Sequence, residues 1–185
     1  MKPALDIGDF TRAAGVIGCS VSAIKAVCTV EAPRGGFLPS GQPAILFERH
    51  QFSKRTGGKF DKSNPGISGP RGGYRGGDAE HARLAEAAAL DRTEALSSTS
   101  WGKFQIMGFN YVAAGFVTLQ GFINAMFDSE SAHLDAFVAF IMHERLDDEL
   151  REMRWADFAR RYNGLAFADN RYDTKLAAAY DVAKG

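Results

Sequence analysis

The chain has 185 residues and a mass of 20.1 kDa, and 45% of its residues are hydrophobic, which is enough for one well-packed domain. Its 22 basic residues balance its 22 acidic residues, so the overall charge gives no reason to expect nucleic acid or an anionic membrane as a partner. The balance is uneven along the chain, because residues 32 to 76 carry a net charge of +6.

The two cysteines, Cys19 and Cys28, are separated by about 13 Å of predicted helix, so we expect free thiols and a reducing cytosol. No run of about 18 apolar residues occurs, and the first residues lack an apolar core followed by a cleavage site. We therefore expect a soluble monomer of one domain, residues 1 to 185, made in the cytoplasm without a signal peptide and without membrane insertion.

The second predicted helix carries an apolar stripe that ends in a glutamate. A short helix comes before it, from about residue 9 to 14, and ends at the glycines Gly15 and Gly18. Ser20 can cap the next helix, and spacings of three, four and three place four residues on one face: Val21, Ile24, Cys28 and Glu31. Partial desolvation of a carboxyl group at such a position raises its pKa, which suits general acid catalysis near neutral pH. The alternative is that Glu31 turns outward at a frayed helix end.

Residues 32 to 77 differ in composition from the rest of the chain. They hold 11 of the 20 glycines and five of the six prolines, so we expect no helix to run through them. The run QPAILFERHQF at residues 42 to 52 predicts a strand, with Glu48 and His50 on the same face. The basic stretch that follows predicts an irregular hairpin or a long loop. We expect residues 32 to 77 to form a small β lobe.

From residue 78 the pattern is helical, apart from the interruption SSTSWGKFQIMG at residues 97 to 108. Helices are predicted from Asp78 to about Leu90, from Asp91 through Leu96, from Phe116 to Phe127, from Asp128 or Ser129 through Ile141, from Trp155 to Asn163, and from Asn170 or Asp173 through Tyr180. Core positions in the strongest of them are Leu134, Phe137, Val138 and Ile141. The predicted fold class is α+β, mostly α-helical, with a small β-hairpin lobe.

Several kinds of site are excluded by the absence of their motifs. The four histidines show no HExxH spacing and the two cysteines do not make a zinc site, so we expect no metal and no cofactor. We expect His133 and His143 on helix surfaces. Neither GxSxG nor a phosphate-binding glycine motif occurs, and Cys28 is expected to be a core residue rather than a nucleophile.

Paired carboxylates remain as candidates for chemistry. Glu31 ends a helix, and Glu48 follows 17 residues later at the end of ILFE. A helix that leads through a turn into an adjacent strand can bring two carboxyl groups across a cleft, which is the minimum for acid-catalysed hydrolysis of a glycosidic bond. His50 could orient Glu48. The alternative for Glu48 is a salt bridge with a neighbouring arginine, Arg49 or Arg55.

Two further stretches carry candidate sugar contacts. In SWGKFQIMG, the Gln105 amide can bond sugar hydroxyl or acetamido groups, whereas Trp101 and Phe104 are expected to be buried aromatics at a corner between helices. In RYNG, Tyr162 and Asn163 lie at a helix end, where the pattern fits either a binding site or a simple helix stop.

Three stretches in this order resemble the N-acetylmuramidase family of phage endolysins and related bacterial cell-wall hydrolases: VEAPRGGFLPSGQPAILFERH, SSTSWGKFQIMGFNY and ADFARRYNGLAFADNRYDTKL. The glutamate at a helix end and the later small-x-Gly-x-x-Gln-Ile motif are more distantly similar to goose-type lysozymes and soluble lytic transglycosylases. The resemblance implies a lysozyme-like fold with a groove between a helical body and a β lobe. Glu31 matches the family's catalytic glutamate, and Ala32 replaces the serine that usually follows it.

The resemblance implies cleavage of peptidoglycan between N-acetylmuramic acid and N-acetylglucosamine, so the expected partners are peptidoglycan glycan strands. Glu31 would donate a proton, and Glu48 would stabilise the oxocarbenium charge or activate water. Residues expected to bind substrate or orient these groups are His50, Tyr74, Gln105, Tyr162 and Asn163. The alternatives are a lytic transglycosylase that forms 1,6-anhydro-muramic ends, or a non-catalytic wall-binding module. The enzyme would reach the wall after release through a separate membrane lesion or a secretion route.

Overall fold

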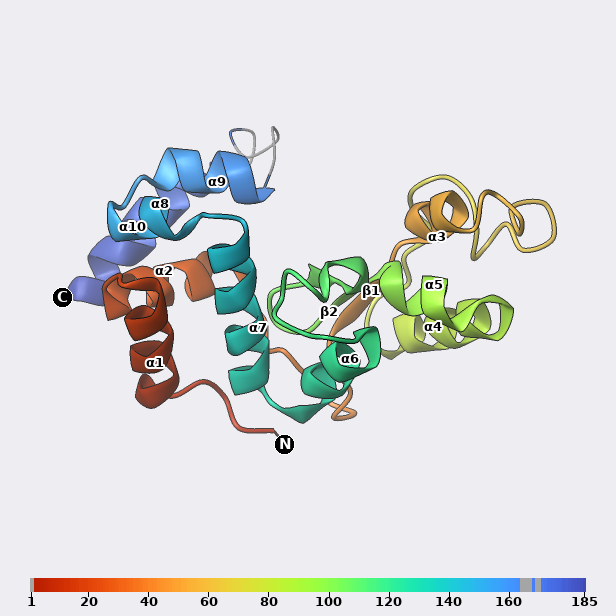
Figure 1. Cartoon of the computed structure of the whole chain (residues 1–185), viewed down its shortest axis with the longest axis horizontal. Coiled ribbons are helices and arrows are strands. Elements are labelled where there is room, and N and C mark those ends of the chain that lie inside the picture. The colour runs from red at the N-terminus through yellow and green to blue at the C-terminus, as the bar shows by residue number, and fades with distance from the viewer. Residues whose placement is uncertain (1, 164–167, 169–170) are drawn as a thin grey trace.

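The computed structural model of the chain describes residues 2–163, 168 and 171–185. Within these residues it has ten α-helices, one 3-10 helix and three β-strands (Figure 1). The helices are α1 (Ile7–Ile17), α2 (Val21–Glu31), α3 (Arg49–Arg55), α4 (Asp78–Leu90), α5 (Arg92–Ser97), η1 (Gly108–Asn110), α6 (Leu119–Asp128), α7 (Glu130–His143), α8 (Asp147–Arg151), α9 (Trp155–Asn163) and α10 (Tyr172–Lys184). The strands are β1 (Ile45–Phe47), β2 (Thr99–Trp101) and β3 (Ile106–Met107).

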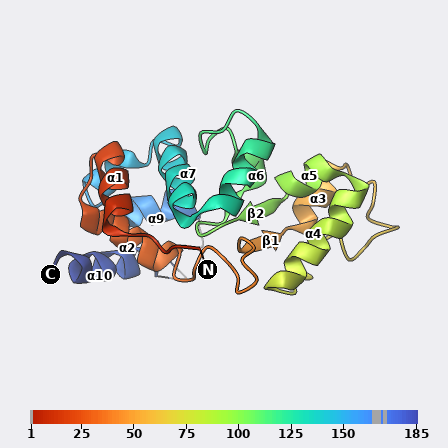
Figure 2. The ribbon, with the colours of Figure 1, turned by 90° about the horizontal axis from the view of Figure 1, so that it is seen from below.

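Two groups of helices lie at opposite ends of the molecule, with the sheet and α6 between them (Figure 1 and Figure 2). We call α1, α2 and α7 to α10 the helical body, and α3, α4 and α5 the small lobe. The sheet is antiparallel in the order β1-β2-β3, with Ile45 opposite Trp101 and Trp101 opposite Ile106. This arrangement confirms the predicted class, α+β and mostly helical.

Polar caps begin the helices where the sequence predicts them. The side chains of Ser20, Asp91 and Ser129 each accept a hydrogen bond from a backbone N–H in the first turn of α2, α5 and α7. α1 is longer than predicted, because Gly15 lies inside it. The helix ends at Ile17, and Gly18 caps it in the left-handed conformation. α4 is capped by Gly77, so Asp78 is its first residue rather than its cap.

The prediction of one strand over residues 42 to 52 is confirmed only for Ile45–Phe47. β1 pairs with β2 over only three residues, and Arg49–Arg55 forms the helix α3. These seven residues contain neither glycine nor proline, so nothing prevents a helix inside the glycine-rich segment. Phe52 on α3 is fully buried, with its ring centroid 5.8 Å from that of Phe47, so a core contact fixes the helix. His50 therefore lies on a helix and does not share a strand with Glu48.

The interruption SSTSWGKFQIMG forms a β-hairpin, β2 and β3, rather than a corner between helices. Residues 32 to 77 thus supply only β1 of the sheet. Trp101 and Phe104 are buried, as expected, and the Trp101 Nε1 donates to the Leu96 carbonyl at 3.2 Å. All four predicted core residues of α7 are buried, and the ring of Phe137 stacks on Phe104 with centroids 4.4 Å apart.

His133 is buried on α7, which overturns the expectation of a surface position, whereas His143 is exposed. The Nδ1 of His133 accepts a hydrogen bond from the Lys103 N–H at 3.1 Å. The Nε2 of His133 therefore carries the proton and donates it to the Met126 carbonyl at 2.8 Å. Burial lowers the pKa of His133, which keeps the ring neutral. Phe37 stacks on this ring with centroids 5.0 Å apart.

A nearly buried ion pair lies beside this histidine. Glu130, in the first turn of α7, accepts a hydrogen bond from the Gly36 N–H, and its Oε2 lies 3.2 Å from the Lys103 Nζ. The same Nζ donates to the Arg34 carbonyl at 3.3 Å. We call Lys103, Glu130 and His133 the α7 anchor. It joins the segment after α2, the β2–β3 turn and the helical body at one point.

A second buried ion pair joins β1 to α4. The Glu80 carboxylate accepts from the Arg83 guanidinium at 2.8 Å and from three backbone N–H groups, those of Phe47, Arg75 and Gly76. Burial acts to raise the pKa of Glu80, but the hydrogen bonds from the backbone outweigh burial and lower that pKa below its ordinary value. Glu80 therefore holds the loop before α4 against the sheet in its ionised form.

Among the described residues, no single helix has both the length and the apolar character needed to span a membrane. α1 and α2 meet those criteria only as a pair, and they are bent by 108° at their junction.

We predict opposite effects on stability for two glycine substitutions. A Cβ at Gly36 would lie 2.5 Å from the His133 Nδ1, so Gly36→Ala should lower the free energy of unfolding by about 1–3 kcal/mol. Gly15 lies within α1 with no such neighbour inside 4 Å, so Gly15→Ala should raise it by up to about 1 kcal/mol. Urea denaturation measures both. An equal effect of the two substitutions would contradict the close packing at Gly36.

We also predict that Glu80 contributes to acid sensitivity. Because its pKa is lower in the folded protein than the ordinary 4.5, its stabilisation is complete above that pH and is lost as the pH falls through the folded value. Glu80→Gln should cost about 3 kcal/mol at pH 7 and should flatten the loss of stability between about pH 5 and 3. Denaturation at several pH values tests this, with exposed Glu86→Gln on the same helix as control. Matching pH profiles for the two variants would refute the assignment.

Candidate active site

Glu31 is the last residue of α2 and is half-buried. The helix ends there because Pro33 follows one residue beyond the buried Ala32, whose N–H still bonds the Cys28 carbonyl at 3.1 Å. Cys28 and Ile24 on the same stripe are buried, and burial raises the pKa of the Cys28 thiol to about 12. The apolar stripe therefore anchors the helix and presents its terminal glutamate at the edge of the core.

Two hollows of the surface meet at Glu31. We call the first, of about 370 Å³, the tyrosine hollow; its lining is Glu31, Phe104, Gln105, Ile106, Met107, Asn110, Phe140 and Tyr162. We call the second, of about 450 Å³, the arginine hollow; its lining is Glu31, Gln105 and residues 32–35, 37–39, 44–46, 76–77 and 102–103. Because Glu31 and Gln105 line both, the two hollows form one groove between the helical body and the sheet, with the carboxyl group at its middle.

Tyr162 lies next to Glu31 in the tyrosine hollow. Its ring stacks on Phe158 with centroids 5.5 Å apart, and its hydroxyl donates to the Phe104 carbonyl at 3.4 Å. Burial, and after it the negative charge of Glu31, raise the pKa of Tyr162 above its ordinary value. The hydroxyl is therefore neutral at any physiological pH. The structure brings Tyr162 and Gln105, both predicted from the sequence, together with Glu31.

Gln105 is exposed and has a φ of 50°, in the left-handed region that few non-glycine residues occupy. Its Nε2 donates to the Gly102 carbonyl at 2.8 Å and to the Ala44 carbonyl at 3.2 Å, and its Oε1 accepts from the Ser100 hydroxyl at 2.8 Å. These bonds hold the β2–β3 turn against the segment before β1. The amide thus shapes the groove wall, and one lone pair of Oε1 remains for a further donor.

Glu48 lies at the N-terminus of α3 and lines neither hollow. Its nearly buried carboxylate accepts from the Tyr74 hydroxyl at 2.7 Å, and its Oε2 lies 3.0 Å from the His50 Nδ1. Tyr74, which is exposed, also accepts from the Arg71 Nε at 3.2 Å. The predicted contact between His50 and Glu48 exists, but these residues form a separate cluster on the small lobe. The salt bridge of Glu48 with Arg49 or Arg55 is absent from the described contacts.

Of the other predicted residues, Asn163 is the last residue of α9, and its side chain lies outside the described part of the chain. Sequence reasoning missed Asn110, Phe140, Arg34 and Lys103, all of which line the groove. For Arg34 a signal existed, because it follows Glu31 by three residues at a proline break. For Phe140 and Asn110 there was none, since their place depends on how α7 and η1 pack.

A larger hollow of about 730 Å³ lies beside the groove, between α2, α10 and the N-terminal arm. Its lining is mostly small and apolar. Of its three charged groups, Lys103 and Glu130 pair with each other, and the Lys25 Nζ lies 5.9 Å from the centroid of the Phe10 ring. It therefore offers less chemistry than the groove, despite its size. In the described residues, no group of three or more His, Cys, Asp or Glu side chains could hold a metal ion.

Comparisons with known proteins bear on the family and the fold of the chain. The profile of the N-acetylmuramidase family matches residues 20–184, which include Glu31, Gln105 and Tyr162. Among solved structures, the crystal structure of Burkholderia AP3 phage endolysin is similar with a TM-score of 0.92 and 42% sequence identity, over 97% of this chain and 71% of that chain. A comparison with curated proteins finds no match.

Proposed function

Because the chain belongs to the N-acetylmuramidase family of glycoside hydrolases, we propose that it cleaves the β-1,4 bond between N-acetylmuramic acid and N-acetylglucosamine in peptidoglycan. The observation that carries the proposal is the position of Glu31 where the two hollows meet. A glycan strand lying along the groove places sugars on both sides of this carboxyl group and a glycosidic oxygen beside it. The similar phage endolysin supports a role in the lysis of bacterial cell walls.

In this proposal Glu31 is the general acid that protonates the leaving glycosidic oxygen. Its place at the end of an apolar helical stripe fixes the carboxyl group at the edge of the core, where it lines both hollows. The hydroxyl of Tyr162 also lines the tyrosine hollow, and because its proton is donated to the Phe104 carbonyl, its oxygen can accept a hydrogen bond from a substrate hydroxyl. The remaining lone pair of the Gln105 Oε1 can accept from an acetamido N–H of a bound sugar.

Two mechanisms remain possible, and they differ in whether a second carboxylate takes part. Glu31 is the one acidic side chain that lines the groove among the residues described, which favours a mechanism with a single acid. In a lytic transglycosylase, the C6 hydroxyl of the muramic acid attacks C1 as the C1–O bond to the leaving sugar breaks. The leaving oxygen takes the proton of Glu31, and the resulting carboxylate takes the proton of the C6 hydroxyl. This is our second candidate function, whose product is a 1,6-anhydro end.

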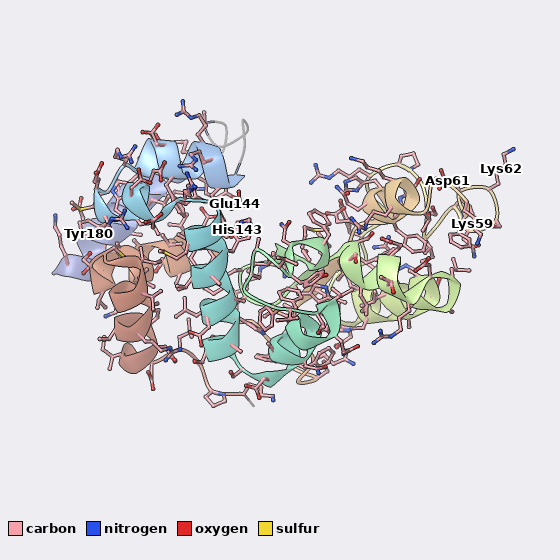
Figure 3. The ribbon with its side chains drawn as sticks, viewed as in Figure 1. Lys59, Asp61, Lys62, His143, Glu144 and Tyr180 are labelled. Carbon is pink, nitrogen blue, oxygen red and sulfur yellow. The ribbon has the colours of Figure 1, made fainter. Side chains whose placement is uncertain are left out.

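We predict that Glu31→Gln lowers the release of glycan fragments from purified peptidoglycan by at least about 100-fold, because an amide has no proton to donate. Thermal unfolding should be almost unchanged. Glu144→Gln at the exposed end of α7 is the matched control and should retain full activity (Figure 3). Mass spectrometry of the wild-type digest separates the two mechanisms, because anhydro ends lack one water. Retained lysis by Glu31→Gln would contradict the assignment.

We predict that Glu48→Gln keeps activity within about tenfold of wild type, because the carboxylate lines neither hollow. It should instead lower the free energy of unfolding by about 1 kcal/mol, because the hydrogen bond between the Tyr74 hydroxyl and a charged group is weakened. Kinetics and urea denaturation measure the two effects. A loss of activity as large as that of Glu31→Gln would establish the second catalytic carboxylate that the sequence predicts.

A further inference from the structure

The arginine hollow contains a cation that the fold does not use. Arg34 is exposed on the segment that follows α2, only three residues after Glu31. Its carbonyl accepts from the Lys103 Nζ, but its guanidinium makes no hydrogen bond or ion pair with any of the residues described. A contact with Lys103 therefore holds the backbone of Arg34 at the rim of the groove and leaves its five N–H donors available.

The charge of the groove is asymmetric about Glu31. Arg34 and Lys103 both line the arginine hollow, whereas no cationic side chain among the described residues lines the tyrosine hollow. Lys103 is paired with Glu130, so Arg34 supplies the positive charge that the protein leaves unneutralised. A ligand with negative charge on one side only would fit this distribution.

A furrow of about 600 Å³ continues from the arginine hollow, since Gly35, Phe37, Leu38 and Pro39 line both. It runs toward the N-terminal arm, and Lys2 lines it with its Nζ 5.8 Å from the centroid of the Phe37 ring. The furrow therefore leads away from the sugar-binding groove and adds a second exposed cation. A glycan strand already lies along the groove in our proposal, so the furrow is free for a branch of the polymer.

Peptidoglycan has such a branch. The lactyl group of muramic acid carries a short peptide stem with several carboxylates, whereas N-acetylglucosamine is neutral and unbranched. Resting on the function proposed above, we propose that the arginine hollow and the furrow joined to it bind the peptide stem of a muramic acid residue, with Arg34 pairing with one of its carboxylates. The planar guanidinium is suited to this, because it bonds a carboxylate through two parallel N–H groups.

The test compares two substrates that share a glycan backbone. One is soluble glycan strands with their peptide stems intact. The other is the same strands after an amidase has hydrolysed the amide that joins each stem to its lactyl group, which leaves a lactyl carboxylate but no stem. For wild type, kcat/KM should be higher on the intact strands. Arg34→Gln should lower the ratio of kcat/KM on intact strands to that on stripped strands by about five- to tenfold, mainly through KM. Arg34→Lys, which keeps the charge but not the paired donors, should recover part of the ratio.

Lys62→Gln is the matched control, because it removes an exposed cation from the outer tip of the small lobe, far from the groove (Figure 3). Its ratio should equal that of wild type. An unchanged ratio for Arg34→Gln, or an equal fall of kcat/KM on both substrates, would overturn the inference while the hydrolase assignment stands. If wild type cleaves neither kind of strand, the proposed function itself fails.

Discussion

The groove depends on the α7 anchor, in which Lys103, Glu130 and His133 join three parts of the chain. Glu130 and His133 belong to α7, Lys103 belongs to the β2–β3 turn, and their partners include Gly36 and Arg34 after α2. Each polar group is nearly buried and satisfied, and removing one partner would leave a charge or a donor unpaired in the core. The groove walls on both sides of Glu31 are therefore fixed to one helix, which gives a rigid support for the proposed acid.

Much of the fold follows from patterns that act locally. The caps at Ser20, Asp91 and Ser129 and the apolar spacing of α7 are short-range signals, and the structure confirms them. The failures occur where a tertiary contact decides the outcome. Residues 49 to 55 become a helix because Phe52 packs into the core, and β2 and β3 form a hairpin because β1 supplies a partner strand. His133 is buried because two neighbouring chain segments cover it and satisfy both of its ring nitrogens.

The candidate site was predictable to a similar extent. Glu31 ends an apolar stripe, and Gln105 and Tyr162 lie in sequence motifs. These three residues, for which the sequence carries a local signal, line the same hollow. The prediction for Glu48 rests on a helix that leads through a turn into an adjacent strand and so brings two carboxyl groups across a cleft. The short β1 instead leads at once into α3, and the carboxylate is held by Tyr74 in another cluster. Sequence alone cannot distinguish these cases, because they differ in where the strand ends and not in which residues it contains.

The basic residues of the segment from 32 to 76 have different roles, which depend on the contacts that the fold gives them. Of the basic residues between 32 and 76, Arg49 donates to the carbonyls of Pro65 and Pro70, and Arg55 pairs with Glu94, so these two are structural. Lys59 and Lys62 extend from the outer tip of the small lobe (Figure 3). Only Arg34 combines an unused charge with a place in the groove. A cation beside the proposed acid contributes to the choice of substrate when it meets a carboxylate there, whereas a distant lysine contributes only a screened, long-range attraction. For recognition of an anionic branch, therefore, the position of Arg34 matters more than the net charge of the segment.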